Sequence, residues 1–417
     1  MMSFSVSEFC QRAKAASLQL ARLTEAEKNA ALEAIAQGIE EQQASILAAN
    51  ALDMAAGREK GLDDAMLDRL LLTPERLLKL AAAVRQVAAL PDPVGQIRDL
   101  TTRPNGIQVG RMRIPLGVIA MIYEARPNVT ADAGALCLKS GNAVILRGGR
   151  EALHSSLAIA AVMQQALQQQ GIDPAAISVV PDPDRDLLLQ LLQQKQYIDL
   201  VIPRGGEGLI HFVSDHSKIP VIQHYKGICH LYVDKDADLD KALALLLNGK
   251  TQRPGVCNAL ETLLVHQQIA EHFLPKAAAA LAAQQVDVFA CAQSLGFFAG
   301  AQLADAQQFD TEYLRLAMSV KTVPDYAAAI MHIQRHSSGH TEVICTQDYS
   351  TAQRFIRDIN SAVVMVNASS RFSDGGELGL GAEIGISTSK LHAYGPMGLE
   401  SLTTEKYLVL GDGQVRS

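Results

Sequence analysis

One cysteine stands in a loop that proline and glycine interrupt, within Lys250-Thr-Gln-Arg-Pro-Gly-Val-Cys257-Asn-Ala-Leu-Glu-Thr262. Lys250 and Arg253 precede it closely. A thiol on such a loop, near cations, is typical of a nucleophilic cysteine because positive charge favours the thiolate. Cysteine is also among the most buried residue types and often acts as a small hydrophobe, so the loop alone does not establish a nucleophile.

The other cysteines and the histidines lack such surroundings. Those that fall inside apolar helix or strand patterns, and are expected in the core, are Cys137, Cys229 and Cys345. Those without a motif around them are Cys10 and Cys291. No Cys-x-x-Cys pair occurs, which argues against a zinc centre and a disulfide framework. The histidines show no triad or metal spacing, so we expect His224 and His230 to be structural or polar lining and predict no metal site.

The elements that position a site are indicated by residues 115–235, where short apolar runs alternate with helical stretches. The runs expected to be strands are 117–123, 143–146, 177–180, 198–202 and 228–233. Continuous apolar strands alternating with helices predict a parallel, doubly wound α/β sheet. Ligands of such sheets gather outside the carboxyl ends of the strands.

Three of these strands are followed by polar segments, and two of these segments contain a pair of glycines. They are Glu-Ala-Arg126-Pro-Asn128, Arg147-Gly148-Gly149-Arg150 and Pro203-Arg204-Gly205-Gly206. Arg-Gly-Gly at two such positions suggests a phosphate-bearing ligand, since glycine lets backbone approach and arginine supplies a charged fork. Neither G-x-G-x-x-G nor G-x-x-x-x-G-K-[ST] is present. Each Arg-Gly-Gly is equally compatible with an ordinary turn and a solvated arginine.

Residues 236–365 repeat the strand–helix texture and predict a second α/β unit that contains Cys257. Its further strands are expected at 261–266, 320–323, 342–346 and 362–366. A glycine-rich segment follows at 367–383, and loops of that length tend to be functional. At the N-terminus, 8–50 predict two helices with a capping box from Thr24 to Glu27, and 62–89 predict helix with a restart at Thr73-Pro74.

A polar hairpin is expected at 95–113, around the turn Pro104-Asn105-Gly106. It has little to bury in its own domain, so we interpret it as an arm that reaches another subunit. A solvated hairpin is the alternative, because isolated ribbons are marginal. The run 402–411 predicts a last strand, a natural partner for this hairpin.

Composition excludes several classes of protein. The chain has 417 residues, of which 19% are charged, and its formal net charge is −7. No apolar run approaches the roughly eighteen residues that span a bilayer. Without a basic run or a recognisable leader, we expect a cytoplasmic protein whose main partner is neither nucleic acid nor membrane.

Taken together, the motifs resemble one family. Those quoted above, with Gln-Arg-Pro-Gly-Val-Cys257-Asn, Val-Asn367-Ala-Ser-Ser-Arg371-Phe and Gly395-Pro-Met-Gly-Leu-Glu400, closely resemble the gamma-glutamyl phosphate reductases (glutamate-5-semialdehyde dehydrogenases) of the aldehyde dehydrogenase superfamily. The resemblance runs in order from about residue 8 to residue 411. It implies an aldehyde dehydrogenase-like fold with two doubly wound parallel-sheet domains and a small β oligomerisation element.

The resemblance also implies domain boundaries and partners. The cofactor-binding domain would comprise 1–94, 115–232 and 367–397, and the catalytic domain 233–366. The oligomerisation element would comprise 95–114 and 398–417. The expected partners are the small-molecule substrate, further copies of the chain in a homo-oligomer, and glutamate 5-kinase as the pathway neighbour.

The implied reaction is the NADPH-dependent reduction of L-glutamate 5-phosphate to L-glutamate 5-semialdehyde and phosphate, the second step of L-proline biosynthesis. Cys257 would form a thioester, which accepts hydride where a carboxylate does not. The family places an oxyanion-hole amide at Asn128, beside the Cys257 backbone N–H. From the residues alone, Asn128 could equally be a helix cap after Pro127.

Further roles follow from the resemblance. Cofactor contacts fall on Arg147, Gly148, Gly149, Arg150, Pro203, Arg204, Gly205, Gly206 and Glu312. NAD-preferring relatives carry a glutamate where this chain has Arg150; an arginine suits a 2′-phosphate, so NADP is expected, although Arg150 could be a helix-surface residue. Glu312 matches a glutamate that contacts the nicotinamide ribose. The substrate contacts are Arg126, Asn258, Asn367 and Arg371.

One absence separates reaction classes. Hydrolytic aldehyde dehydrogenases place a water-activating glutamate in the stretch matching 219–230, which here contains no carboxylate. Without that base, phosphate can take the acyl group. The alternatives are another non-hydrolytic acylating aldehyde dehydrogenase, a cysteine acyltransferase without nicotinamide, which needs a histidine base near Cys257 that no motif supplies, or a non-enzymatic binding module.

Overall fold

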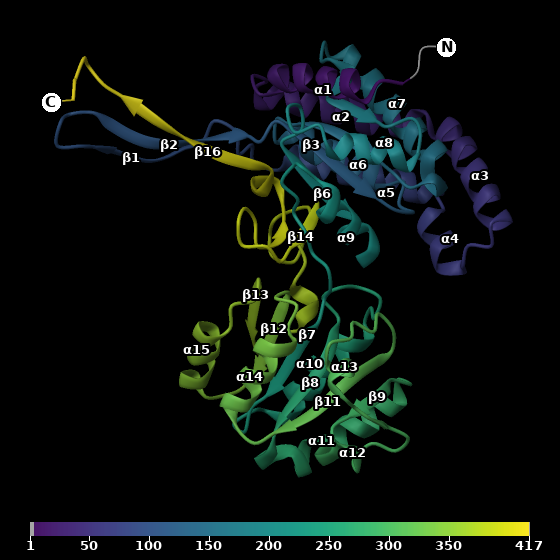
Figure 1. Ribbon diagram of the computed structural model, residues 1–417, viewed down its shortest axis with the longest axis vertical. Coiled ribbons are helices and arrows are strands. Elements are labelled where there is room, and N and C mark those ends of the chain that lie inside the picture. The colour runs from purple at the N-terminus through teal and green to yellow at the C-terminus, as the bar shows by residue number, and fades with distance from the viewer. Residues whose placement is uncertain (1–3, 417) are drawn as a thin grey trace. The chain divides into compact units, whose positions relative to one another are not determined.

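The computed structural model describes residues 4–416, which form two compact units (Figure 1). Unit 1 extends to Gln223 and also contains Leu380–Gly385 and the chain from Met397. Unit 2 comprises His224–Gly379 and Ile386–Pro396. This division assigns 224–232, 367–379 and 386–396 to the unit that carries Cys257, whereas the boundaries predicted from the sequence give them to the cofactor domain.

The N-terminal part of unit 1 is helical. Its helices are α1 (Val6–Leu20), α2 (Glu25–Glu41), α3 (Gln43–Glu59), α4 (Asp64–Leu70) and α5 (Pro74–Ala89). The expected capping box is confirmed, because Thr24 and Glu27 satisfy each other's backbone N–H groups. Thr73 caps α5, with Pro74 in its first turn. The sequence predicts one helix where the structure has α2 and α3, because Gln42, at their boundary, makes no side-chain capping bond that would mark a break.

The sheet of unit 1 confirms the predicted parallel α/β arrangement. Its order is β5-β4-β3-β6, and all its pairings are parallel. The strands are β3 (Val118–Tyr123), β4 (Ala143–Arg147), β5 (Ile177–Val179) and β6 (Leu200–Arg204). The helices between and after them are α6 (Val129–Lys139), α7 (Leu153–Gln169), α8 (Arg185–Leu192) and α9 (Glu207–His216). All six residues of β3 are buried, which explains its unbroken apolar run.

The sheet of unit 2 has the order β10-β9-β11-β8-β7-β12-β13. Its strands are β7 (Cys229–Val233), β8 (Leu260–His266), β9 (Asp287–Ala290), β10 (Gln302–Leu303), β11 (Ala317–Val323), β12 (Thr341–Cys345) and β13 (Val363–Val366). Its helices are α10 (Leu239–Thr251), α11 (Gln267–Ala283), α12 (Ala292–Leu295), α13 (Ala306–Phe309), α14 (Tyr326–His336) and α15 (Tyr349–Asp358). β9 and β10, which the sequence did not indicate, are short and partly exposed.

β7 corrects one sequence expectation. The run 228–233 was placed with the first series of strands, but β7 pairs with β8 and β12 in the second sheet. An apolar run identifies a strand and carries no information about its neighbours, so the change of sheet was not visible.

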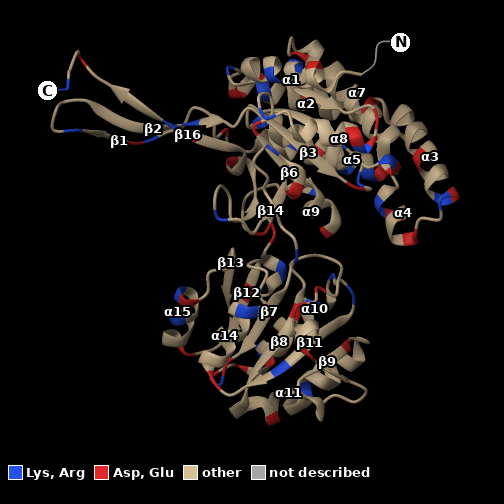
Figure 2. Cartoon of the chain, viewed as in Figure 1, with Lys and Arg blue, Asp and Glu red and all other residues tan. Residues whose placement is uncertain are grey.

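An arm of three antiparallel strands belongs to unit 1: β1 (Ile97–Thr102), β2 (Gln108–Pro115) and β16 (Thr403–Leu410) (Figure 1). The expected turn is present, with Gly106 at φ 87°, and so is the pairing of the hairpin with the last strand. Charges of both signs lie along it (Figure 2). Glu405 contacts three arginines, with N–O distances of 2.6 Å to Arg98, 3.5 Å to Arg111 and 3.6 Å to Arg113. These ion pairs connect all three strands.

Short elements complete the chain. They are the 3₁₀ turns η1 (Arg150–Ala152), η2 (Pro174–Ala176), η3 (Ser370–Phe372) and η4 (Leu399–Leu402), and the strand pair β14 (Gly385–Ser387) and β15 (Gly395–Met397). Among residues 4–416, no helix combines the length and apolar character needed to cross a bilayer.

Candidate active site

Two predicted cofactor segments lie at the carboxyl ends of strands that flank β3. Arg147 ends β4 and leads through Gly148 and Gly149 to Arg150, the exposed first residue of η1. Pro203 and Arg204 end β6, and Gly205 and Gly206 lead into α9. Because β4 and β6 both pair in parallel with β3, the structure brings these segments to one edge of the sheet.

Arg147 has the character of a ligand-binding arginine. Its Nη2 donates to the Pro183 carbonyl at 2.6 Å, while its buried Nε has no hydrogen-bond partner within residues 4–416. Burial lowers the pKa of Arg147, although a guanidinium stays charged at neutral pH. Arg204, at the end of β6, lies 3.9 Å from a carboxylate oxygen of Glu383. A buried donor without a partner is costly, which favours an incoming anion at Arg147.

Two glutamates occupy backbone donors in the same loops. The Gly206 N–H donates to Glu124 at 3.0 Å, and the Ala125 N–H donates to Glu151 at 2.6 Å. These carboxylates satisfy amides that an anion could otherwise bind. Of the glycine amides at this edge, that of Gly206 is therefore already occupied by a carboxylate.

Asn128 stands immediately before α6, in the loop after β3. Its side chain makes no capping hydrogen bond, so the cap that the sequence left open is not formed. Its Nδ2 instead donates to Asp132 Oδ2 at 2.9 Å. Burial raises the pKa of Asp132 to about 6. Both Asn128 and Arg126 are exposed, so their side chains can reach a ligand.

Cys257 lies half-buried in the loop between α10 and β8. Lys250, at the end of α10, is fully buried and its Nζ donates to Glu261 Oε2 at 2.6 Å. Burial lowers the pKa of Lys250 and raises that of Glu261 to about 7. The expected support of the thiolate by Lys250 is therefore largely offset by Glu261, and the pair instead anchors the two ends of the loop.

The loop backbone packs against Gly227. A Cβ on Gly227 would lie 2.1 Å from the Cys257 carbonyl oxygen, so a side chain there would displace the loop. The Gly227 N–H donates to Glu312 Oε1 at 2.9 Å. Gly227 therefore lies between the backbone of the Cys257 loop and Glu312, the predicted ribose contact. It also brings a carboxylate to the stretch 219–230, which has none of its own.

Arg371 is held beside the same loop. Asn258 Nδ2 donates to the Ser373 carbonyl at 2.9 Å, and Ser370 Oγ donates to the Asn258 carbonyl at 2.7 Å. These bonds fix η3, which carries Arg371, against the residue after Cys257. Burial, followed by repulsion from Arg253, lowers the pKa of Arg371, while attraction to Cys257 opposes that shift. Arg371 is thus a cation that acts near the thiol, and Arg253 acts on Arg371.

The other predicted substrate contacts differ in how their amides are used. Asn258 Oδ1 is buried without a hydrogen-bond partner in the described chain. Asn367 has φ 54°, and its amide accepts from the Thr346 N–H at 3.0 Å and donates to the Thr346 carbonyl at 2.8 Å. Asn258 therefore offers an open acceptor, whereas Asn367 also joins the ends of β12 and β13.

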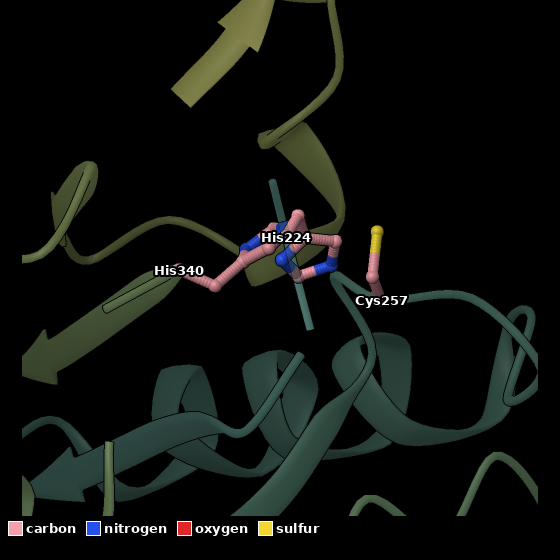
Figure 3. A group of neighbouring side chains, drawn as sticks. All are labelled: His224, Cys257 and His340. Carbon is pink, nitrogen blue, oxygen red and sulfur yellow. The ribbon is translucent and has the colours of Figure 1, made fainter. Parts of the chain in front are cut away.

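Two histidines lie beside Cys257 (Figure 3). The Cys257 sulfur and a ring nitrogen of both His224 and His340 all lie within 4.8 Å of one another. The two rings are 5.0 Å apart between centroids. Spacing gave no sign of this group, because the residues come from three separate segments and His340 directly precedes β12. No recognised motif surrounds either histidine in the sequence, so only the fold reveals them.

Burial determines the chemistry of His340. It lowers the pKa of His340 to about 3, with a smaller contribution from His224, so the ring is neutral at pH 7. A neutral ring with so low a pKa is a weak general base but a good lone-pair donor. The neighbouring Cys229 is inert, since burial raises its pKa well above the ordinary value and its S–H donates to the Cys257 carbonyl at 3.3 Å.

Known proteins resemble this chain over its whole length. The model of the aldehyde dehydrogenase family matches residues 3–307. The gamma-glutamyl phosphate reductase of Idiomarina loihiensis is 64% identical over 98% of both chains. That of Shewanella denitrificans is 62% identical over 100% of this chain and 99% of its own. The crystal structure of gamma-glutamyl phosphate reductase from Thermotoga maritima, at 43% identity, covers 99% of this chain and 100% of its own with a TM-score of 0.98.

The fold, the loop that presents Cys257 and these similarities agree with one another. Family membership carries with it an oxidoreductase that uses a nicotinamide cofactor and forms glutamate 5-semialdehyde in proline biosynthesis. The chain belongs to the aldehyde dehydrogenase family and, within it, to the gamma-glutamyl phosphate reductases, which are glutamate-5-semialdehyde dehydrogenases.

Proposed function

We propose that this enzyme reduces L-glutamate 5-phosphate with NADPH through a thioester on Cys257, releasing phosphate and L-glutamate 5-semialdehyde. The observation that carries the proposal is the placement of Cys257, half-buried on a loop that hydrogen bonds fix beside Arg371. A thiol in that electrostatic setting is suited to attack an anionic acyl phosphate.

Cys257 carries the acyl group through the covalent steps. The Cys257 thiolate attacks the acyl carbon, a C–S bond forms, and the C–O bond to phosphate breaks. NADPH, when bound, would supply the hydride that reduces the thioester carbonyl on Cys257 to a hemithioacetal oxyanion, leaving NADP. When that oxyanion collapses, the C–S bond breaks, the aldehyde leaves and the thiolate is restored.

Asn128 and the Cys257 backbone N–H are the proposed donors to the oxyanion. Both donate to oxygen where negative charge develops, which is where a hydrogen bond lowers the barrier most. The exposed Asn128 amide, which is not used as a cap, is compatible with that role.

Arginines are proposed to hold the anionic groups. Arg147 and Arg204 fit the cofactor phosphates, since Arg147 presents a buried donor without a partner in the described chain. Glu312 would bond the nicotinamide ribose. Arg371 and Arg126 would hold the substrate phosphate or carboxylate, with Asn258 and Asn367 as further contacts.

The phosphorylating class has a direct test in the reverse direction. We expect NADP reduction by glutamate semialdehyde to depend on inorganic phosphate, because residues 219–230 carry no carboxylate of their own to activate water, and the nearby Glu312 carboxylate accepts from the Gly227 N–H. Absorbance at the NADPH band would be followed with phosphate, with sulfate at equal ionic strength, and without either. Equal multiple-turnover rates without phosphate would overturn the phosphorylating assignment.

Arg150 is proposed to select NADP over NAD. Replacing Arg150 with glutamate should raise the KM for NADPH about 10–100-fold, the loss of one or two charge-assisted hydrogen bonds, and leave the KM for NADH unchanged or lower. Arg58→Glu, at an exposed position on α3, makes the same charge change elsewhere on unit 1 and should alter neither constant. Unchanged constants in Arg150→Glu would show that Arg150 is only a surface residue.

The arm is proposed to join copies of the chain in a homo-oligomer. It exposes apolar side chains that the other strands of its own sheet do not cover, namely Ile97, Leu100, Tyr407, Val409 and Leu410. Such a surface favours association. Upstream, glutamate 5-kinase would supply the acyl phosphate.

A nucleotide-free cysteine acyltransferase is the second candidate, and the placement of His224 and His340 beside Cys257 favours it. That arrangement meets the requirement for a nearby histidine which the sequence did not satisfy. The low pKa of His340, caused by burial, makes this ring a poor base at pH 7. Fluorescence resonance energy transfer from the protein to NADPH separates the two candidates. It should be observed with the reductase and be absent with an acyltransferase, which would bind no nucleotide.

A further inference from the structure

The group formed by His224, Cys257 and His340 has the composition of a metal site. One sulfur and two imidazole nitrogens lie within 4.8 Å of one another, on three separate segments of unit 2 (Figure 3). Thiolate and imidazole are the ligands that Zn²⁺ takes in tetrahedral sites. A three-ligand set of this kind leaves the fourth position to water.

His340 is oriented for a ligand by the residues behind it. Thr341 Oγ1 donates its only proton to Ser373 Oγ at 2.8 Å. It can therefore only accept at His340 Nδ1, 2.7 Å away, which places the ring proton on Nδ1. The lone pair is then on Nε2, which is buried and has no hydrogen-bond partner in residues 4–416.

This arrangement is the one that metal-bound histidines use. Such a histidine donates its second ring N–H to an oxygen acceptor, which fixes the tautomer and the direction of the ligating lone pair. The hydrogen bonds from His340 to Thr341 and from Thr341 to Ser373 fix the tautomer and direction of His340 in the same way. A buried acceptor without a donor costs free energy, and a metal ion that accepts the lone pair of Nε2 removes that cost.

The spacing requires only a small adjustment. Tetrahedral bond lengths of about 2.3 Å to sulfur and about 2.0 Å to nitrogen place the ligand atoms about 3.3–3.6 Å apart. His340 is buried and held by Thr341, whereas Cys257 and His224 are only half-buried. Movement of these two side chains by about 1 Å closes the site.

We infer that His224, Cys257 and His340 bind one Zn²⁺ ion and that this ion reversibly inactivates the enzyme by occupying the nucleophile. The step exchanges a proton for the metal: Cys257 S–H and Zn²⁺ give Cys257 S–Zn and H⁺. No electron is transferred. Zinc binding requires only the three ligands, whereas the loss of activity rests on the proposed function, in which Cys257 is the nucleophile.

Cobalt gives a readout that does not depend on turnover. We expect Co²⁺ titrated into the reduced, metal-free enzyme to produce a sulfur-to-cobalt charge-transfer band and the visible bands of a tetrahedral ion, saturating at one ion per chain. Zn²⁺ should abolish these bands by displacement. Cys257→Ser should remove the charge-transfer band, because cobalt then has no thiolate ligand.

Histidine variants test the ligand set. His224→Gln and His340→Gln should each weaken Zn²⁺ binding at least about tenfold, measured by competition with a chromophoric chelator. Mutating a residue that only hydrogen-bonds to a metal ligand already lowers metal affinity about tenfold or more. His272→Gln, on the exposed face of α11, is the matched control and should bind as the wild type does. Circular dichroism identifies a variant that fails to fold. If His340→Gln fails to fold, the test relies on His224→Gln, because His224 is only half-buried.

Activity then separates this inference from the proposed function. Zn²⁺ should inhibit competitively with glutamate semialdehyde, should slow alkylation of Cys257, and should be reversed by a chelator. Absence of a thiolate–cobalt band in the wild type, or wild-type zinc affinity in both histidine variants, would overturn the metal site. A cobalt band in a protein without reductase activity would instead overturn the proposed function and leave the metal site standing.

Discussion

Replacing Cys257 with serine is expected to lower kcat/KM for glutamate semialdehyde oxidation at least about 10⁴-fold. The reason is that the acyl group then has no sulfur to carry it, and a serine hydroxyl without a strong base nearby remains protonated. His340 is no substitute base, because burial lowers its pKa to about 3. The measurement is phosphate-dependent NADP reduction at saturating cofactor.

The control for this change is Cys291→Ser. Cys291 is the other cysteine of intermediate exposure in the described chain, and it occupies the N-cap position of the short helix α12, where its Sγ lies 3.3 Å from Ser294 Oγ. It should retain wild-type rates. Cys257→Ser should still bind NADPH and unfold at the same temperature. More than a tenth of the wild-type activity in that variant would contradict the thioester mechanism.

Replacing Asn128 with alanine is expected to lower kcat about 10²–10³-fold, equivalent to about 3–4 kcal/mol of barrier. The amide is proposed to donate to the oxyanion, which exists only after attack, so the KM for NADPH should stay unchanged. The measurement is the separate determination of kcat and KM by steady-state kinetics. A fall confined to KM would contradict the role.

Asn128→Ser distinguishes this role from helix capping. Serine caps a helix as well as asparagine does, but it cannot place an amide donor at the oxyanion. The structure shows no capping bond from Asn128, so we expect the serine variant to be as inactive as the alanine variant and equally stable to urea. Full activity in Asn128→Ser would restore the cap interpretation. Asp132→Asn reports whether the 2.9 Å bond to Asp132 matters for activity.

The sequence was informative wherever a residue's role depends on its chain neighbours. The buried strands, the capping box at Thr24 and the turn at Gly106 are local patterns, and all were predicted. The position of the thiol on a broken loop was also visible. The membership of β7 in the second sheet was not, because pairing partners lie far along the chain.

The site shows the same division. Cys257 was chosen by its loop, and Arg371 by a motif whose residues turn out to be hydrogen-bonded to that loop. Lys250 was expected to assist the thiol because it is close in sequence, but the fold pairs it with Glu261. His224 and His340 could not be found, since β-sheet topology alone brings a loop residue and the residue before β12 to the same place.

The arm has a consequence for the order in which a nascent chain can be completed. β2 is paired on one side by β1, its neighbour in the sequence, and on the other by β16, with Arg113 bonded to Thr403 across 290 positions. Unit 2, whose longest segment ends at Gly379, leaves the ribosome before that partner does. During synthesis a thiol-bearing unit can therefore be folded while the edge of β2 is still open, and an open edge recruits foreign strands. Closure of the arm therefore follows synthesis of unit 2, and a chain cut before Thr403 would keep its nucleophile but leave the edge of β2 open to aggregation.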